Sequence, residues 1–390
     1  MVELFDQDAT AKLLTWCEVD TSALSGNMAA LRRHLPSTCA LAPAVKSNAY
    51  GHGLIATARA FLRGGAEWLC VHTIDEAVAL RAAEISCPIY LFGPTLVTRL
   101  DEVVALGIEL VIYQRDHLDA LRALARRDPH ATRKVGLHLK VETGNHRQGV
   151  SVAEALELTR LIKESEGLRL AGVTSHFANI EDTSDHSFAE LQLQRLRVAA
   201  HEISVEWGDT VMCHIANSAA ALLWPERSMA LARVGIASYG LWPSEAVRDR
   251  RSAELSPALR PALSWRARVA QVKEVSEGQP IGYGCTYITT RPTRLAILPV
   301  GYFEGFDRGL SNRGEVLIRG QRAPVRGRVC MNMCMVDVTE ISDVKLGDVA
   351  TLIGRDGDDE ITADEVALWS DTINYEVVTR IAAHIPRLLV

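Results

Sequence analysis

The chain has 390 residues, and 48% of them are hydrophobic, which is enough to form the cores of two domains. Its formal net charge is -6 and no block of basic residues is interleaved with aromatic ones, so we expect no nucleic-acid partner. No apolar run approaches the roughly 20 residues of a membrane span, and residues 1–8 lack the basic and apolar regions of a secretion signal, so we expect a cytoplasmic protein without a membrane partner.

The first predicted helix covers residues 24–35, where leucines and a methionine recur at helical spacing behind the possible caps Asp20, Thr21 and Ser22. From there to about residue 255, short apolar runs alternate with longer segments of helical period. Eight of these runs are predicted strands: 40–46, 67–71, 89–92, 109–112, 136–141, 170–175, 211–215 and 231–236. Eight successive βα units predict a TIM-type (β/α)8 barrel over residues 1–255.

A doubly wound open sheet would show the same alternation of strands and helices. However, no G-x-G-x-x-G sequence follows the first predicted strand, and no Walker lysine loop occurs anywhere in the chain. The barrel is therefore the better interpretation, and nucleotide binding has little support.

The pattern changes near residue 256, where Pro257 and Pro261 interrupt the chain and residues 265–275 alternate between apolar and polar types. Further short runs rich in Val, Ile and Leu are separated by turn residues and predict strands at 294–300, 315–319, 334–338 and 348–353. One helix is expected near 362–370. Residues 256–390 are therefore predicted to form a second, mostly β domain.

The cysteines are scattered through apolar stretches, which is typical of buried free thiols rather than of a disulfide framework. Cys330 and Cys334 are spaced like a pair of metal ligands, but no second Cys or His pair lies at ligand spacing nearby. We therefore expect no metal.

Lys46 closes the first apolar run, with Tyr50, Gly51 and Gly53 just behind it. A lysine at the end of a buried strand is partly desolvated, which lowers its pKa and makes its amine available to attack an aldehyde. This pattern suggests a covalent pyridoxal 5'-phosphate site, although a surface lysine in a βα loop fits these residues about equally well.

The active site of such a barrel lies at the C-terminal ends of its strands, so the polar residues to consider are those on or just after the predicted runs, as Lys46 is. They are Tyr50, Lys140, Arg147, His176, Asn217, Ser218 and Arg233. Each alone has an ordinary explanation, such as a core histidine, a helix cap or a salt-bridge partner. Their shared placement is harder to explain without a common site.

Nearly the whole chain resembles the alanine racemase family, which has fold type III of the pyridoxal-phosphate enzymes. The resemblance is carried, in the same order, by residues 44–53, 140–147, 175–178, 216–220, 233–237, 282–287, 301–302, 330–331 and 374–377. It implies interconversion of L- and D-alanine by two groups on opposite faces of the α-carbon, Lys46, which also holds the cofactor, and Tyr283.

The resemblance also implies a hydrogen-bond chain from Tyr283 through His176 to Arg233 at the pyridine nitrogen. Guanidinium stays protonated and gives the ring no proton, so the neutral ring is a weaker electron sink and side reactions are suppressed. By the same resemblance the phosphate is held by Tyr50, Ser218, Tyr375 and the N–H groups of Gly235 and Ile236, with Asn217 in support.

Three further implications concern the substrate and the assembly. Lys140 would be carbamylated and would orient Arg147, which contacts the cofactor and the substrate carboxylate. Substrate contacts would also come from Met331 and Tyr302, and the entrance would be shaped by Tyr302, Tyr375 and Ile373 and made positive by Arg308 and Arg328. Because Tyr283 lies outside the barrel, the resemblance implies a head-to-tail homodimer in which each C-terminal domain completes the partner's site.

The chain departs from the family pattern at Asn332, where most members carry aspartate, and at Asn145, His146 and Glu181. These departures leave open a broad-specificity or serine-preferring racemase of the same fold. A fold-III decarboxylase or a non-catalytic pyridoxal-phosphate carrier is less favoured, because neither combines Tyr283 and Arg233 with a second domain.

Overall fold

The structure is a computed structural model that describes residues 10–390; residues 1–9, on which the expected cytoplasmic location partly rests, lie outside the described residues. The described chain divides into two compact units. One comprises residues 23–49 and 54–261, and the other comprises residues 10–22, 50–53 and 262–390. No helix within residues 10–390 is long and apolar enough to span a membrane.

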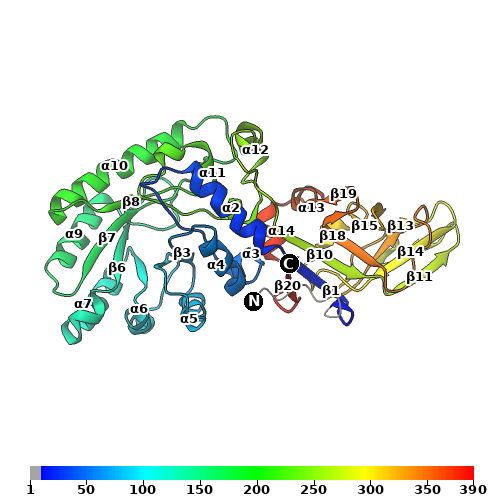
Figure 1. Cartoon of the computed structure of the whole chain (residues 1–390), viewed down its shortest axis with the longest axis horizontal. Helices are drawn as coiled ribbons and strands as arrows, with labels where there is room; N and C mark the ends of the chain where they lie inside the picture. The colour runs from blue at the N-terminus through cyan, green and yellow to red at the C-terminus, as the bar shows by residue number, and fades with distance from the viewer. Residues whose placement is uncertain (1–9) are drawn as a thin grey trace. The chain divides into compact units, whose positions relative to one another are not determined.

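The first unit is a barrel of parallel strands wrapped by helices (Figure 1). Its strands are β2 (Ala40–Leu41), β3 (Leu69–Val71), β4 (Ile89–Leu91), β5 (Glu109–Ile112), β6 (Gly136–Lys140), β7 (Arg169–Thr174), β8 (Met212–His214) and β9 (Leu231–Ala232). Strands β3 to β8 pair in sequence order and β2 pairs with β9. The ring closes because Ala230 N–H donates to the Cys213 carbonyl at 3.1 Å and Val45 N–H donates to the Cys70 carbonyl at 2.8 Å.

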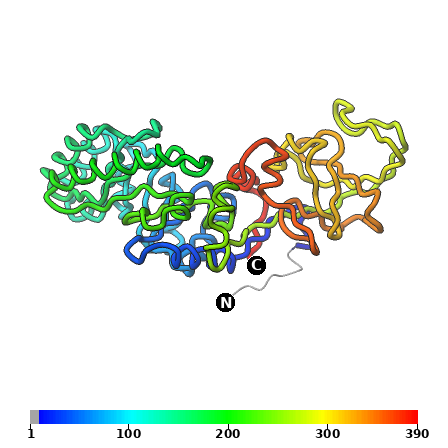
Figure 2. The backbone as a smooth tube through the Cα atoms, turned by 90° about the horizontal axis from the view of Figure 1, so that it is seen from above, coloured from blue at the N-terminus to red at the C-terminus, as the bar shows by residue number. Residues whose placement is uncertain are grey.

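The helices lie outside the strands, and Figure 2 follows the chain from blue to green around them. They are α2 (Thr21–His34), α4 (Leu54–Arg63), α5 (Ile74–Ala82), α6 (Leu100–Leu106), α7 (Arg115–Arg127), α8 (Pro129–Thr132), α9 (Val152–Lys163), α10 (Ser187–Trp207), α11 (Ser218–Leu223) and α12 (Glu245–Arg251). Helix α7 illustrates the pattern, since Leu118, Leu121 and Ala125 recur at helical spacing on its buried face.

The predicted barrel is confirmed, because each of the eight predicted runs overlaps one strand. The helix predicted over 24–35 is also confirmed, but it begins at Thr21, so two of the three possible caps lie inside its first turn. Most strands are shorter than the predicted apolar runs, because the residues at the ends of the runs leave the regular pairing between strands. Ala44, for example, forms only an isolated bridge to Cys70.

The second unit is mostly β, as predicted. Its largest sheet has seven strands: β1 (Thr15–Val19), β10 (Leu263–Arg268), β15 (Glu315–Ile318), β16 (Gln321–Pro324), β18 (Val349–Asp356), β19 (Asp359–Ile361) and β20 (Arg387–Leu389). Smaller sheets contain β11 (Gln271–Val275), β14 (Thr293–Leu298), β17 (Cys334–Asp337), β12 (Pro280–Ile281) and β13 (Tyr287–Ile288). The helices are α13 (Ala363–Ser370), which confirms the predicted helix, and α14 (Asn374–Thr379).

Strand β1 was not predicted from the sequence. It pairs antiparallel with β10 and parallel with β20, so the start of the described chain completes the sheet of the second unit. Trp16, Cys17 and Val19 are buried there. A single short strand that precedes the barrel by sequence carries no local sign of a partner some 250 residues away.

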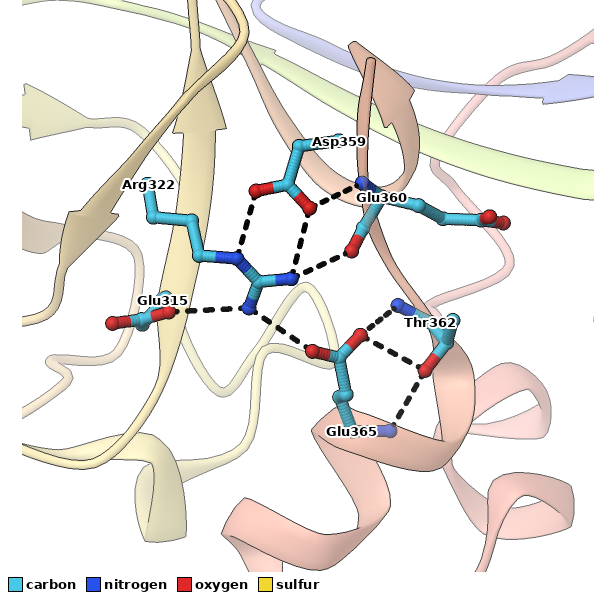
Figure 3. Close-up of polar contacts among 6 residues, drawn as sticks. All are labelled: Glu315, Arg322, Asp359, Glu360, Thr362 and Glu365. Carbon is cyan, nitrogen blue, oxygen red and sulfur yellow. Dashed lines mark hydrogen bonds and ion pairs between the residues drawn. The ribbon is translucent and has the colours of Figure 1, made fainter.

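Arg322 on β16 ties together the edge of this sheet (Figure 3). Its guanidinium pairs with Asp359 at 2.9 Å, with Glu315 at 3.2 Å and with Glu365 at 3.0 Å. Glu365 also accepts hydrogen bonds from the Thr362 N–H and hydroxyl, so the cluster reaches the capping box that starts α13. The network therefore links β15, β16, β19 and α13.

Candidate active site

Lys46 begins a single turn of left-handed backbone at the end of the first barrel strand. Ser47, Asn48, Ala49 and Tyr50 all have φ between 51° and 56°. Residues with a Cβ disfavour this conformation by about 1–2 kcal/mol each, so four in a row mark a strained segment, and strain of this kind gathers at functional sites. The turn is held by bonds from Ser47 N–H to Glu76 at 2.6 Å and from Leu54 N–H to the Asn48 side chain at 3.0 Å.

The environment of Lys46 favours a neutral amine. Burial lowers its pKa, the positive charge of Arg147 lowers it further, and Glu76 partly opposes them. The Lys46 Nζ lies 5.6 Å from the centre of the Phe92 ring. The lysine thus has the property that the sequence pattern suggested, an amine that can act as a nucleophile.

Arg233 follows β9 and is 9% exposed. Its guanidinium donates to the Ser175 carbonyl at 2.8 Å, to the Thr174 hydroxyl at 3.2 Å and to the Ile215 carbonyl at 3.3 Å. It also contacts the ring nitrogens of His214 and, at 3.4 Å, of His176. None of these partners is a carboxylate, so the positive charge of Arg233 is held by neutral dipoles alone.

His176 stands where four cationic side chains converge. Burial is the main cause of its low pKa, and the charges of Lys140, Arg233, Arg147 and Lys46 each lower the pKa further. The backbone at His176 is fixed by Gln192 on α10, whose amide donates to the His176 carbonyl at 3.1 Å and accepts from Ala178 N–H at 2.9 Å. This end of the barrel therefore has the excess positive charge that an anionic ligand requires.

Ser218 and the start of the short helix η3 (Ile236–Tyr239) form a second part of the site. The Ser218 hydroxyl is buried and accepts hydrogen bonds from Gly235 N–H at 2.8 Å and Ala237 N–H at 3.3 Å. The intervening Ile236 N–H has no acceptor within residues 10–390. The N-cap of α11 is Asn217 rather than Ser218. The side-chain amide of Asn217 also donates to Glu181 at 3.0 Å.

Lys140 and Arg147 lie on and after β6. Lys140 is buried, and its pKa is lowered well below its ordinary range by burial and then by Arg233 and Arg147. Arg147 is exposed and follows a turn in which Glu142 accepts hydrogen bonds from the N–H groups of Gly144 and Asn145, at 2.5 and 2.7 Å. The charges of Arg233 and Arg147 thus act on Lys140 more strongly than the opposing charge of Glu142.

The remaining predicted site residues belong to the second unit. Tyr283 is 72% exposed at the start of the short helix η4 (Tyr283–Cys285), in a turn with positive φ at Gly282, Gly284 and Cys285. The Arg328 guanidinium closes over this turn, because its Cζ lies only 3.1 Å from where a Cβ on Gly284 would stand. The turn thus presents the tyrosine outward.

Tyr302, Met331 and Asn332 lie on two turns that one buried carboxylate joins. Glu304 accepts hydrogen bonds from Gly301 N–H at 2.8 Å and from the Asn332 amide at 2.8 Å. Tyr302 and Met331 remain exposed beside it. The Asn332 amide therefore serves as a donor to Glu304, which an ionised carboxylate at this position could not do.

Tyr50 and Tyr375 group with the second unit and contact each other, with ring centres 6.3 Å apart. Ile373 is exposed just before α14, and Arg308 begins the short helix η5 (Arg308–Leu310). The barrel holds one electrostatically coupled group of predicted site residues: Lys46, Lys140, Arg147, His176 and Arg233. Asn217 and Ser218 follow β8, the strand between those that precede His176 and Arg233.

Sequence analysis missed Glu76, which fixes the turn after Lys46, and Thr174 and His214, which hold Arg233. The signal for His214 was a histidine inside an otherwise apolar strand, which looks like an ordinary core residue. Neither Cys330 nor Cys334 belongs to any group of three or more Cys, His, Asp or Glu side chains that could hold a metal in the described chain.

Two family models match this chain. Residues 19–243 match the model for the N-terminal domain of alanine racemase, and residues 262–389 match that for its C-terminal domain. An alanine racemase of Methanococcus maripaludis is 37% identical over 374 residues, covering 96% of this chain and 98% of that protein.

Solved structures are similar over the same length. An alanine racemase from Streptomyces lavendulae is 36% identical with a TM-score of 0.89, over 96% of this chain and 97% of that one. A further alanine racemase, from Bartonella henselae and with covalently bound pyridoxal phosphate, is 26% identical with a TM-score of 0.83, over 97% of this chain and 100% of that one.

Proposed function

The chain belongs to the alanine racemase family, its reaction is the pyridoxal-phosphate-dependent racemisation of alanine, and we propose that Lys46 and Tyr283 are the groups that exchange the α-proton. One observation carries the assignment of the site. A lysine of lowered pKa and three other cationic side chains converge on His176 at the end of the barrel where the strands terminate.

The residues at this end of the barrel fit pyridoxal phosphate. The buried Ile236 N–H, which has no acceptor among residues 10–390, lies beside the Ser218 hydroxyl and suits a phosphate oxygen. Tyr50, Tyr375 and Gly235 would complete the binding of the phosphate, with Asn217 in support. Arg233 offers a permanently protonated donor to the ring nitrogen, and the lowered pKa of Lys46 makes its amine more available to the aldehyde. When bound, the cofactor makes the α-hydrogen of the amino acid acidic enough to be removed.

Racemisation requires one acid/base group on each face of the α-carbon. Lys46 accepts or returns the proton on one face, because burial and Arg147 keep its pKa below the ordinary lysine value. Tyr283 does so on the other face, and in the proposed dimer its hydroxyl would hydrogen-bond to His176, whose ring nitrogen Arg233 contacts at 3.4 Å. Tyr302, Met331 and Arg147 bind the substrate around this pair.

We also propose that Lys140 is carbamylated. The neutral amine of a lysine attacks carbon dioxide, forming an N–C bond and releasing a proton, and the pKa of Lys140 lies well below its ordinary range. The resulting anion would offset the charge of the neighbouring Arg147 and fix its direction. Mass measurement of the intact protein under carbon dioxide, with Lys140→Met as the control, tests this step.

The assembly that this mechanism needs is a head-to-tail homodimer. In it, residues 1–255 supply the cofactor-binding barrel and residues 256–390 complete the partner's site with Tyr283, Tyr302 and Met331. The exposure of these three side chains on their own unit is consistent with a partner surface. A cytoplasmic location accords with the eight free thiols of the chain.

Mixing two inactive variants tests the shared site. Lys46→Ala should abolish the visible absorbance of the bound cofactor, whereas Tyr283→Phe should keep it and lose racemisation; Lys134→Ala, at the other end of β6, is the control. In a heterodimer of the two variants, one site has both Lys46 and Tyr283. An equal mixture that exchanges subunits should therefore recover roughly a quarter of wild-type activity, and no recovery would assign both groups to one chain.

The substrate range needs a separate assay, because broad-specificity and serine-preferring racemases share this skeleton. Circular dichroism should show fast loss of signal with L-alanine and slow loss with L-serine, L-lysine and L-arginine. Equal rates with the larger substrates would instead identify a broad-specificity racemase.

A further inference from the structure

A chain of buried polar side chains crosses the barrel interior behind Arg233. Glu109 on β5 contacts His138 on β6, with 3.2 Å between its Oε2 and the His138 Nε2. The His138 Nδ1 lies 2.9 Å from the His214 Nε2 on β8, and the His214 Nδ1 contacts Arg233. These four side chains, here called the relay, link the start of β5 to the proposed cofactor site.

The chemistry of the two ends fixes the direction of every hydrogen bond in the relay. Guanidinium can only donate, so the His214 Nδ1 facing Arg233 accepts and the proton of that neutral ring is on Nε2. That proton is donated to the His138 Nδ1, which places the His138 proton on Nε2, facing the carboxylate of Glu109. Burial lowers the pKa of each histidine and so favours the neutral ring, although Glu109 partly opposes this at His138.

The barrel strands make room for the relay with glycines. A Cβ on Gly136 would lie 1.6 Å from the Glu109 Oε2, and a Cβ on Gly172 would lie 2.6 Å from the His138 Nδ1. The ring of Tyr90 packs against both histidines, with ring centres 4.7 Å from His138 and 5.4 Å from His214. The relay therefore requires glycine at these two strand positions, because a side chain at either one would occupy its space.

We propose that Glu109 is a positioning residue for racemisation, acting through His138 and His214 to hold Arg233. This inference rests on the proposed role of Arg233 at the cofactor ring. Glu109 accepts the proton at the far end of the relay and so keeps the His214 lone pair directed at the guanidinium. Its charge also supports a cation that has no carboxylate of its own.

Loss of the acceptor at position 109 would leave the buried His138 Nε2–H without a partner, so only Arg233 would still favour this direction. The His138 proton could then move to Nδ1, where it would be donated to the His214 Nε2, and His214 would carry its own proton on Nδ1. The His214 Nδ1–H would then face an N–H of Arg233, so two donors would meet with no acceptor between them. Arg233 would have to move, and the cofactor ring would lose its fixed partner.

The test compares two variants at 109 with a matched control in the holoenzyme. Glu109→Gln keeps an acceptor but removes the charge, and Glu109→Leu removes both. Arg169→Met removes a second partner of Glu109, an ion pair of 2.9 Å, while all four relay side chains stay in place. The readouts are the nitrogen-15 NMR shifts of the two histidines, which report the tautomer directly, and kcat and KM for alanine.

We expect the wild-type enzyme to show protonated Nε2 and bare Nδ1 on His138 and on His214, with signals assigned from His138→Gln and His214→Gln. Glu109→Leu should reverse both tautomers and lower kcat about tenfold at unchanged KM, with a smaller loss for Glu109→Gln. Arg169→Met should leave tautomers, kcat and KM as in wild type.

A protonated Nδ1 on His138 in the wild type would overturn the proposal, even if Glu109→Leu fails to fold. So would wild-type kcat in a folded Glu109→Leu variant, or an equal loss in Arg169→Met. If the purified enzyme racemised no amino acid, the proposed function would fail, but the tautomers would still decide whether the relay has the stated direction.

Discussion

Each compact unit contains a network centred on one arginine, and the two networks are built in opposite ways. In the barrel, Arg233 is 9% exposed and donates to imidazole, hydroxyl and carbonyl groups. In the β unit, the Arg322 side chain is 33% exposed and pairs with three carboxylates (Figure 3). One cation is held by neutral dipoles and the other is surrounded by opposite charges.

The difference separates a binding role from a structural one. Burial lowers the pKa of Arg233, whereas the hydrogen bonds that Arg322 donates to Asp359, Glu365 and Glu315 raise the pKa of Arg322. An arginine whose charge is already neutralised has little left to offer a ligand. An arginine that is positioned but not neutralised can still bind one.

Removing the charge of Arg233 should therefore impair the reaction, whereas removing the charge of Arg322 should impair stability. The largest effect is expected at Arg233. Arg233→Gln should lower kcat on the order of a hundredfold, because an oriented charged donor at the reacting group is lost. The fraction of turnovers that end in transamination should rise, since the ring would no longer be kept neutral by a permanently protonated partner. Racemisation measured by circular dichroism and pyruvate release report the two effects, and a variant with wild-type kcat would place Arg233 outside the mechanism.

The second expectation is that acid weakens the barrel at a higher pH than the β unit. Burial lowers the pKa of His138, His176 and His214 from the ordinary 6.5, so below that pH the unfolded chain binds protons that the folded barrel refuses. Their contribution to stability is present above pH 6.5 and is lost as the pH falls below it. Arg322 lowers the pKa of Asp359, whose contribution is lost only below about its ordinary 3.8.

Hydrogen exchange followed by mass spectrometry, corrected for the intrinsic effect of pH, can follow both units in one sample. Between pH 7.5 and 5, protection should fall in β6, β7 and β8 and hold in β15 and β18. A parallel loss of protection in both units would contradict the distinction.

The smallest effect is expected from Arg322→Met. The pairs that Arg322 makes are partly exposed and screened by solvent, so the midpoint of thermal unfolding should fall by only about 2–4 °C. Values of kcat and KM should stay at wild-type levels. A loss of activity in a folded variant would show that the structural network also serves the site.

The sequence predicted the parts of the molecule whose signal is local. Apolar runs and helical periods located the strands of the barrel, and the positions of Lys46, His176 and Arg233 in or just after three of those runs indicated the site. Family resemblance added Tyr283, whose own surroundings, an exposed turn between glycines, carry no sign of catalysis.

The parts that escaped prediction depend on partners far apart in the chain. Strand β1 is recognisable only once β10 and β20 are beside it. Glu109, His138 and His214 lie inside strands, where a polar residue looks like an exception in a core, and their common line across the barrel exists only in three dimensions. Gly136 and Gly172 could have hinted at it, because glycine within a strand often leaves room for a neighbour.

The bond between Glu304 and Asn332 constrains the order in which substitutions can accumulate. Asn332→Asp alone would set a second carboxylate against Glu304, whose other oxygen holds Gly301 N–H. If Glu304→Gln came first, its amide could still accept from Gly301 and could donate to the new carboxylate. A carboxylate at position 332 is therefore reached more easily after a change at position 304 than directly.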